Sequence, residues 1–159
     1  MQLQHEFSVP VDLETTFDIL SDVLRVARCM PGATVDRVQE GGIFAGEVEV
    51  RLGPMQVTYR GEGRFVVLDR MQGRAVLEAS GREVRGNGAA RTSVTVQLLE
   101  SGTDQTRVQV ETDLHITGRP AQFGRGVVGD VSDRLLSAFV ECLREEISRG
   151  TAEDTQEDS

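Results

Sequence analysis

Cysteine, histidine and lysine are scarce in this chain of 159 residues, and each scarcity excludes a class of function. The two cysteines, Cys29 and Cys142, lie far apart in the sequence and match neither a metal-binding spacing nor a disulfide framework. We therefore expect two free, partly buried thiols, as in a protein of the reducing cytoplasm. The two histidines, His5 and His115, have no serine or cysteine partner at a recognisable spacing. The sequence thus offers no catalytic triad and no metal-ligand cluster, and we do not expect an enzyme.

Lysine is absent altogether: all 17 basic residues are arginine, against 26 acidic residues, and the formal net charge is −9. This balance argues against nucleic acid as a partner, because phosphate binding needs a face of net positive charge. A run of about 18 apolar residues, enough to span a membrane, is also absent. The first residues, MQLQHEF, lack the basic and apolar regions of a signal peptide. Together with the expected thiols, these absences predict a cytoplasmic protein.

Apolar and polar residues alternate with a period of two over most of the chain, which indicates strands with one buried face. The alternation predicts a first strand at 2–9 and six further strands at 34–39, 44–52, 55–67, 74–82, 90–98 and 106–116. Between the first two strands, Asp12 and Asp22 can each cap a short helix. Glycine-rich turns separate the later strands and favour an antiparallel meander.

The period changes to 3.6 residues near the C-terminus, which predicts one long amphipathic helix at 120–149. Pro120 suits its first turn, and Gly150 is expected to end it. Residues 150–159 are polar and acidic, so we expect a disordered tail there. The chain then divides into a folded ligand-binding domain at 1–149 and an acidic tail at 150–159.

Small residues stand on the apolar face of the two strands at 55–67 and 74–82, where a packed core would have valine or leucine. In the first strand this face carries Met55, Val57, Tyr59, Gly61, Gly63, Phe65 and Val67, and in the second it carries Ala75, Leu77, Ala79 and Gly81. The space that these glycines and alanines leave either admits the long helix or stays open as a cavity. An apolar cavity with few polar groups favours a ligand carrier over a catalyst.

Several short segments resemble, in order, the CoxG family of carbon monoxide dehydrogenase. Residues 29–33 (CMPGA) are similar to that family's CLPGA-like segment, and residues 46–55 (GEVEVRLGPM) with Tyr59-x-Gly61 are similar to its G-x-V-x-V-x-x-G-P-[IM] and aromatic-x-G pattern. Weaker matches follow at Gly81, 86–90, 106–108, Asp113 and 118–124. The resemblance covers residues 1–147.

The resemblance implies an α+β helix-grip (START-like) fold. In this fold a curved antiparallel sheet of about seven strands surrounds the long C-terminal helix, and two short helices follow the first strand. The family resemblance also implies an accessory protein of aerobic molybdenum CO dehydrogenase that works between the enzyme and the membrane. Relatives of this fold bind lipids, sterols, polyketides and other apolar molecules.

We expect the chain to hold an apolar small molecule, a respiratory quinone (menaquinone or ubiquinone), in an internal cavity. It would meet the CO dehydrogenase complex and, transiently, the inner face of the cell membrane, as a peripheral cytoplasmic protein. A recruitment or assembly factor without a ligand-carrying role is the alternative, and a cyclase on the same fold is a third possibility.

The expected ligand-binding residues lie on the inner face of the sheet, on the facing stripe of the long helix and at the end of the second short helix. They are Met30, Val48, Val50, Val57, Tyr59, Gly61, Gly63, Phe65, Leu77, Ala79, Phe123, Val127 and Val131. Tyr59, the only tyrosine, either fills the core and hydrogen-bonds a neighbour or meets the polar head of the ligand. His5 is either a satisfied, partly buried histidine or a second group for a quinone carbonyl.

Overall fold

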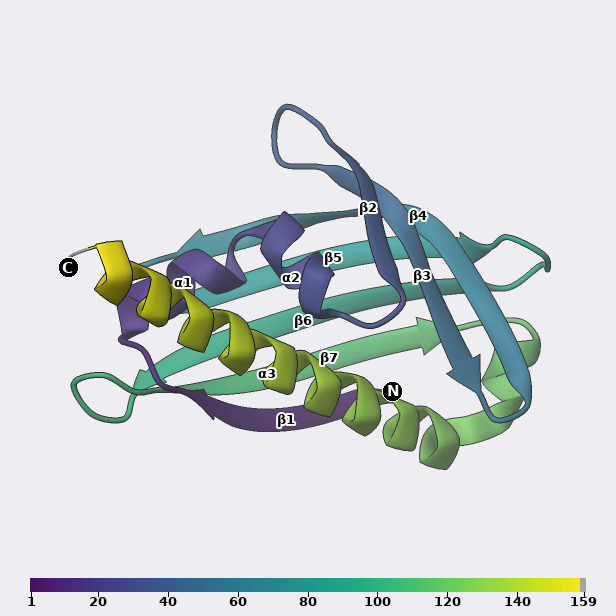
Figure 1. The fold of residues 1–159 in the computed structure, drawn as a ribbon. Coiled ribbons are helices and arrows are strands. Elements are labelled where there is room, and N and C mark those ends of the chain that lie inside the picture. Colours follow the sequence, from purple (N-terminus) through teal and green to yellow (C-terminus); the bar gives the residue numbers. More distant parts are fainter. Residues whose placement is uncertain (158–159) are drawn as a thin grey trace.

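A single seven-stranded antiparallel sheet curves around one long helix in the computed structural model (Figure 1), which describes the backbone of residues 1–157 and the side chains of residues 1–150. In chain order the elements are β1 (Gln2–Val9), α1 (Leu13–Leu20), α2 (Val23–Cys29), β2 (Ala33–Val38), β3 (Phe44–Leu52), β4 (Met55–Asp69), β5 (Arg74–Glu83), β6 (Ala89–Glu100), β7 (Thr106–Ile116), the 3₁₀ helix η1 (Arg119–Phe123) and α3 (Gly124–Glu157). The strand order across the sheet is β1-β7-β6-β5-β4-β3-β2, so β1 and β2 are its edges. The predicted helix-grip architecture is confirmed.

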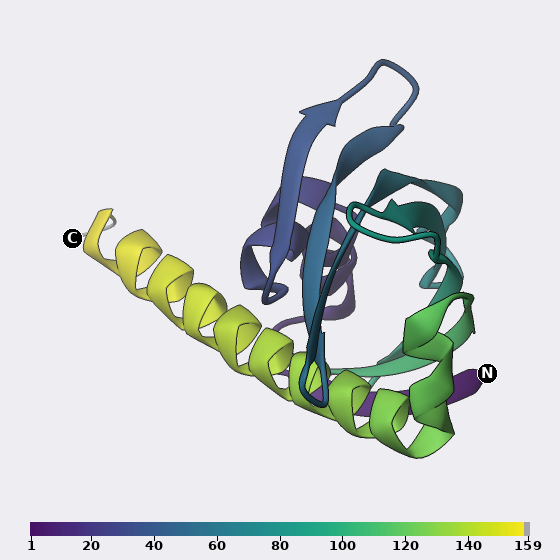
Figure 2. The same ribbon diagram turned by 90° about the vertical axis from the view of Figure 1, so that its right-hand side faces the viewer.

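The two short helices begin where the sequence predicts. The backbone N–H of Thr15 donates to Asp12 Oδ1 at 3.3 Å, and that of Arg25 donates to Asp22 Oδ1 at 3.4 Å. Each carboxylate satisfies an N–H group that the first helical turn leaves unpaired. Both helices lie on the same side of the sheet as α3 (Figure 2), so all three cover its inner face.

The core consists of two apolar clusters arranged along α3. The first core cluster joins β1, β6 and β7 to α1, α2 and the second half of α3; its buried residues are Val9, Phe17, Ile19, Cys29, Leu98, Val108, Phe139, Val140, Leu143 and Ile147. The second core cluster joins the β3–β4 hairpin to the first half of α3; its buried residues are Leu52, Val57, Val128 and Val131. One amphipathic helix therefore holds both ends of the sheet.

A bulge in β4 corrects one sequence expectation. Phe65 pairs with Leu77, but the next aligned pair is Val67 with Val76, so Val66 is an extra residue in β4. An extra residue shifts the alternation by one position, which moves every later side chain to the opposite face. Val67 therefore shares the outer face with Val76 instead of continuing the inner row that ends at Phe65.

The long helix differs from the sequence expectation at both ends. Pro120 lies in η1, and α3 begins only at Gly124. At the other end α3 continues past Gly150 to Glu157. Glycine weakens a helix but ends one only where its backbone leaves the helical region, and Gly150 does not have a positive φ. The domain boundary and the disordered tail at 150–159 stay predictions, because side chains from residue 151 onward and residues 158–159 lie outside the described part of the chain.

Cys29 and Cys142 form a disulfide, so the expectation of two free thiols was wrong. Cys29 is the last residue of α2 and Cys142 lies within α3, and their Cα atoms are 5.3 Å apart. The packing of two helices creates this contact across 113 residues of sequence, so cysteine spacing holds no trace of it. A cytoplasmic location consequently loses the support that free thiols gave it.

We predict that replacing Cys142 by serine lowers the free energy of unfolding by roughly 2–5 kcal/mol, because the disulfide restricts a long loop of the unfolded chain. Urea denaturation of the variant and of the oxidised protein measures the difference. Reduced wild-type protein is the matched control and should unfold near the urea concentration of the variant. A variant as stable as the oxidised protein would contradict the prediction.

Candidate functional site

The inner face of the sheet has a stretch of apolar residues that neither core cluster covers. This uncovered stretch comprises Phe44 and Val48 of β3, Phe65 of β4, Leu77 and Ala79 of β5 and Val94 of β6. These residues are neighbours across the strands, since Phe65 pairs with Leu77 and Leu77 pairs with Val94. None of them is fully buried, and Val48 is 38% exposed although it lies on the inner face. Apolar surface left accessible on a concave face can bind an apolar molecule.

The glycines beside this stretch do not leave open space. A Cβ atom at Gly61 would collide with the backbone oxygen of Ser80, so this glycine allows β4 and β5 to approach closely. A Cβ atom at Gly63 would lie 2.6 Å from the ring of Phe44, so the ring occupies the place of the missing side chain. Neither of the two expected roles, admitting the long helix or making a cavity, describes these two glycines.

Two buried hydroxyl groups on the inner face have no hydrogen-bond partner among the described residues: Tyr59 Oη in β4 and Thr92 Oγ1 in β6. Of the two roles that the sequence left open for Tyr59, a hydrogen bond to a neighbour is thus not realised. Burial raises the pKa of the Tyr59 hydroxyl, and the negative charge of Glu83 raises it further. Tyr59 therefore keeps its proton at neutral pH and is available to donate a hydrogen bond to a ligand.

The structure distributes the thirteen expected ligand-binding residues over four places. The second core cluster takes in Val50, Val57, Tyr59, Phe123, Val127 and Val131. The uncovered stretch contains Val48, Phe65, Leu77 and Ala79. Met30 packs against the first core cluster, and Gly61 and Gly63 are filled as described above.

Sequence reasoning did not select Phe44, Thr92 and Val94 as site residues, although all three lie on the same inner face. The alternation that selected their neighbours was the signal that could have found them. Phe44 begins β3 in register with Gly63, and Thr92 and Val94 occupy inward positions of β6 opposite Ala79 and Leu77.

His5 is already engaged by another side chain. Its Nε2 atom lies 2.7 Å from Asp133 Oδ1 of α3, and the imidazole is 15% exposed. This contact matches the satisfied histidine that the sequence allowed. Tyr59 is consequently the better candidate for a ligand's polar head.

The larger hollows of the molecule lie away from the uncovered stretch. Two of them, of about 560 and 500 Å³, lie on the outer face of the sheet among polar side chains that include Arg64, Glu78, Arg91 and His115. A third, of about 860 Å³, lies between β1 and α3. On the inner side, a gap of about 10 Å³ separates α1 from β5 and β6.

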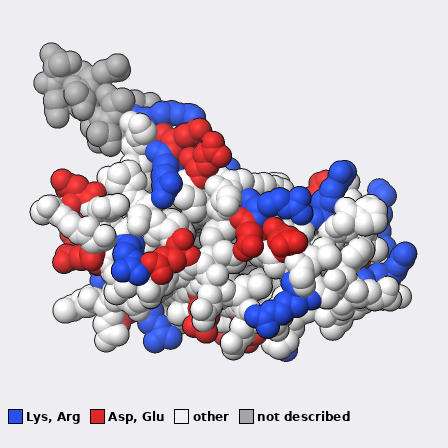
Figure 3. Space-filling model, turned by 90° about the horizontal axis from the view of Figure 1, so that it is seen from below, with Lys and Arg blue, Asp and Glu red and all other residues white. Residues whose placement is uncertain are grey.

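Charge does not mark out a polyanion-binding surface on the face that contains α3 and β1. In Figure 3 acidic and basic side chains are interspersed over this face, with uncharged surface between them. Such a mixture provides no continuous positive field for nucleic acid on the side shown. Within the described residues, no helix is both long enough and apolar enough to cross a membrane.

A curved antiparallel sheet that grips a long helix, with apolar inner surface left accessible, defines the START-like class of proteins. Solved structures agree: a conserved protein from Geobacillus kaustophilus has a TM-score of 0.82 at 15% identity and covers 94% of this chain and 96% of its own. A START superfamily protein from Mycobacterium smegmatis has a TM-score of 0.67 at 12% identity, with coverage of 93% and 97%. The Zhui aromatase/cyclase from Streptomyces sp. R1128 has a TM-score of 0.68 at 15% identity, with 94% of each chain covered. At these identities the likenesses establish the fold alone.

The family model of the carbon monoxide dehydrogenase subunit CoxG matches residues 6–148, and the chain belongs to this family. The resemblance of the short segments is thereby confirmed, and with it a role connected to CO dehydrogenase. No curated protein sequence matches the chain significantly.

We predict that the two unpaired hydroxyls contribute nothing to the stability of the ligand-free protein. Tyr59→Phe and Thr92→Val should leave the free energy of unfolding unchanged or raise it by up to about 1 kcal/mol, because each removes a buried group that has lost its hydrogen bond to water.

Thr106→Val is the matched control for these variants. Thr106 is buried and its hydroxyl donates to the backbone oxygen of Val11 at 2.8 Å, so this variant should lose about 1–3 kcal/mol. Calorimetric unfolding compares the three variants. A loss at Tyr59 or Thr92 as large as that at Thr106 would show that the hydroxyl has a partner after all.

Proposed function

We propose that this chain carries a respiratory quinone, menaquinone or ubiquinone, on the inner face of its sheet and links CO dehydrogenase to the quinone pool of the membrane. The observation that carries the proposal is the combination of the uncovered apolar stretch with two unpaired buried hydroxyls on the same face. A quinone has the matching chemistry, since it joins an apolar isoprenoid tail to a ring with two carbonyl acceptors. The role is that of a carrier and not of an enzyme.

The energetics favour such a ligand. Each CH₂ group moved from water to an apolar surface contributes about 0.8 kcal/mol, so an isoprenoid tail has ample binding energy. A carbonyl that accepts from Tyr59 Oη would remove the cost of an unpaired buried hydroxyl, about 1–3 kcal/mol. Because the gap on the inner side is small, α3 or the adjoining loops must move outward as the ligand enters.

Membership of the CoxG family supplies the partner in this proposal. Oxidation of CO with water yields CO₂, two protons and two electrons, and a quinone takes up two electrons and two protons to become a quinol. The chain would present the quinone to the CO dehydrogenase complex and return the quinol to the inner face of the cell membrane. This places it in the cytoplasm, with transient contact to the membrane surface.

The quinone proposal is tested by uptake from vesicles. Vesicles containing menaquinone are mixed with the protein and removed by centrifugation, and the quinone that remains with the protein is measured by extraction. We expect Ala79→Leu to abolish uptake, because a larger side chain would occupy the uncovered stretch. Ser80→Leu is the control, since it adds a larger side chain on the outer face of the same strand.

Two results would contradict the carrier. Wild-type protein that takes up no quinone, although it binds CO dehydrogenase, would instead favour the alternative, a recruitment or assembly factor. Uptake that Ala79→Leu and Ser80→Leu reduce equally would exclude the inner face as the site.

The β4–β5 turn offers the chain a contact with the membrane surface. Met71 is 97% exposed and Leu68 is 53% exposed, and Arg70 and Arg74 flank Met71. Apolar tips beside arginines suit the boundary between acyl chains and anionic headgroups.

We predict that Met71→Glu slows quinone uptake from anionic vesicles about tenfold, because burying one such side chain contributes about 1.5–3 kcal/mol to membrane contact. Quinone affinity measured in detergent solution should not change. Gln72→Glu adds the same charge one residue away and controls for electrostatics. A Met71→Glu protein with the uptake rate of Gln72→Glu would show that this turn does not touch the membrane.

A further inference from the structure

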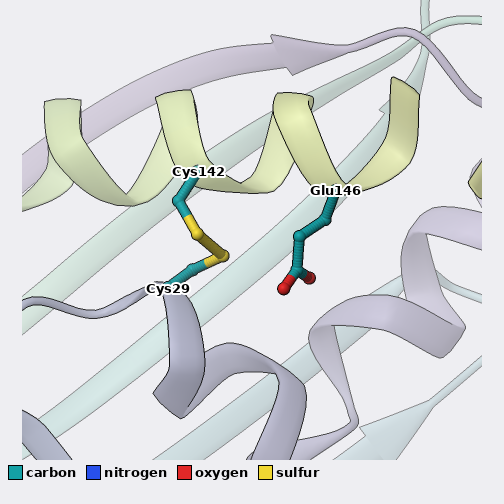
Figure 4. Close-up of side chains that lie close together, drawn as sticks. All are labelled: Cys29, Cys142 and Glu146. Carbon is teal, nitrogen blue, oxygen red and sulfur yellow. A yellow bond between two sulfur atoms is a disulfide. The ribbon is translucent and has the colours of Figure 1, made fainter. Parts of the chain in front are cut away.

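A second group of reactive side chains lies where α2 meets α3, apart from the uncovered stretch. One ligand atom each from Cys29, Cys142 and Glu146 lies within 4.8 Å of the other two. Figure 4 shows the Glu146 carboxylate extending from α3 beside the disulfide, toward the side on which α2 lies. The sequence shows no metal-ligand spacing here, because Cys29 comes from a different helix.

The helix geometry places two of these groups together by construction. Cys142 and Glu146 are four residues apart in α3, so their side chains lie on the same face one turn apart. Cys29, at the last position of α2, faces them and is buried. Two sulfurs and one carboxylate thus converge from two elements that the fold holds in place.

The Glu146 carboxylate is incompletely satisfied by its surroundings. Its Oε2 atom is buried and accepts no hydrogen bond from any residue that the structure describes. Arg25 Nε lies 3.7 Å from Oε2, and Arg28 Nε lies 3.9 Å from Oε1. These ion pairs balance the charge at longer than hydrogen-bond distance, which leaves the carboxylate oxygens able to accept a ligand bond.

We propose that Cys29, Cys142 and Glu146 form a redox-gated site for Zn²⁺. In the oxidised protein the disulfide closes the site, because its sulfurs have no thiolate charge. A dithiol reductant transfers two electrons and two protons, which breaks the S–S bond and converts the dithiol to its own disulfide. The two thiols release their protons to solvent when Zn²⁺ binds to both thiolates and to Glu146.

The chemistry of the donors selects the metal. Zinc accepts thiolate and carboxylate ligands in tetrahedral sites, whereas Mg²⁺ and Ca²⁺ take oxygen ligands. Zn–S bonds of about 2.3 Å require the two sulfurs to separate to roughly 3.8 Å, which side-chain rotation achieves without moving the helices. Three protein ligands leave a fourth position for water.

The site has three states that differ in how α2 is joined to α3. The disulfide joins the helices covalently, zinc joins them by coordination, and the reduced, metal-free chain leaves them held by packing alone. Because α3 covers both core clusters, the state of this site sets how firmly the helix is held on the sheet. This inference is independent of the proposed quinone function.

Zinc titration of the purified full chain tests the proposal. The disulfide is reduced with a phosphine, which becomes a phosphine oxide with an oxygen from water, and the excess is removed without air. Competition with a chromophoric zinc chelator gives the affinity, and Cd²⁺ reports thiolate ligation through its ultraviolet charge-transfer band.

We expect one zinc ion per reduced chain and none per oxidised chain. Failure of the reduced chain to compete with the chelator would overturn the proposal, as would equal binding by the oxidised chain. So would two thiols that mild oxidation does not join.

Glu146→Gln identifies the third ligand, with Glu145→Gln as its matched control. Glu145 is exposed and pairs with Arg149 at 3.6 Å, so its loss should not change zinc binding. Glu146→Gln should weaken zinc binding more than about tenfold, since even outer partners of metal ligands contribute about 10–100-fold. Disulfide formation in the oxidised Glu146→Gln protein, measured by thiol counting, confirms that it folds. Equal zinc affinity of the two variants would overturn the role of Glu146.

Discussion

One helix has to cover the apolar face of seven strands, and the rest of the structure follows from this mismatch. Strands spaced about 4.8 Å apart give a seven-stranded sheet a width of about 29 Å, whereas a helix with its side chains is about 10–12 Å wide. Curvature brings the sheet around α3, and α1 and α2 cover one end (Figure 2). The middle of β3–β6 still remains without a partner, and the apolar residues of the candidate site are located there.

Much of this architecture is readable from the sequence because it depends on local periodicity. Alternation predicts all seven strands, and Asp12 and Asp22 mark the starts of the two short helices. The failures arise where a local pattern lacks the deciding information. Val66 obeys the alternation as well as its neighbours do, and only pairing with β5 reveals it as the extra residue of a bulge. Gly150 signals a helix end, but its backbone stays helical.

The candidate site was predictable as a face and not as a space. The inward rows of β3, β4 and β5 identify the residues that a ligand would meet, but side-chain volume does not reveal what fills each gap. At Gly63 the filling group is the ring of Phe44, which comes from the neighbouring strand. The pairing of Cys29 with Cys142 is hidden for a similar reason, since it is a property of two packed helices.

The position of that disulfide has a topological consequence. Six of the seven strands, β2 to β7, lie in the chain between Cys29 and Cys142, and only β1 precedes the covalent ring. A protease that cuts any one loop inside this ring produces two fragments that remain attached to each other. The nicked molecule keeps its original mass, apart from one added water, until a reductant opens the ring.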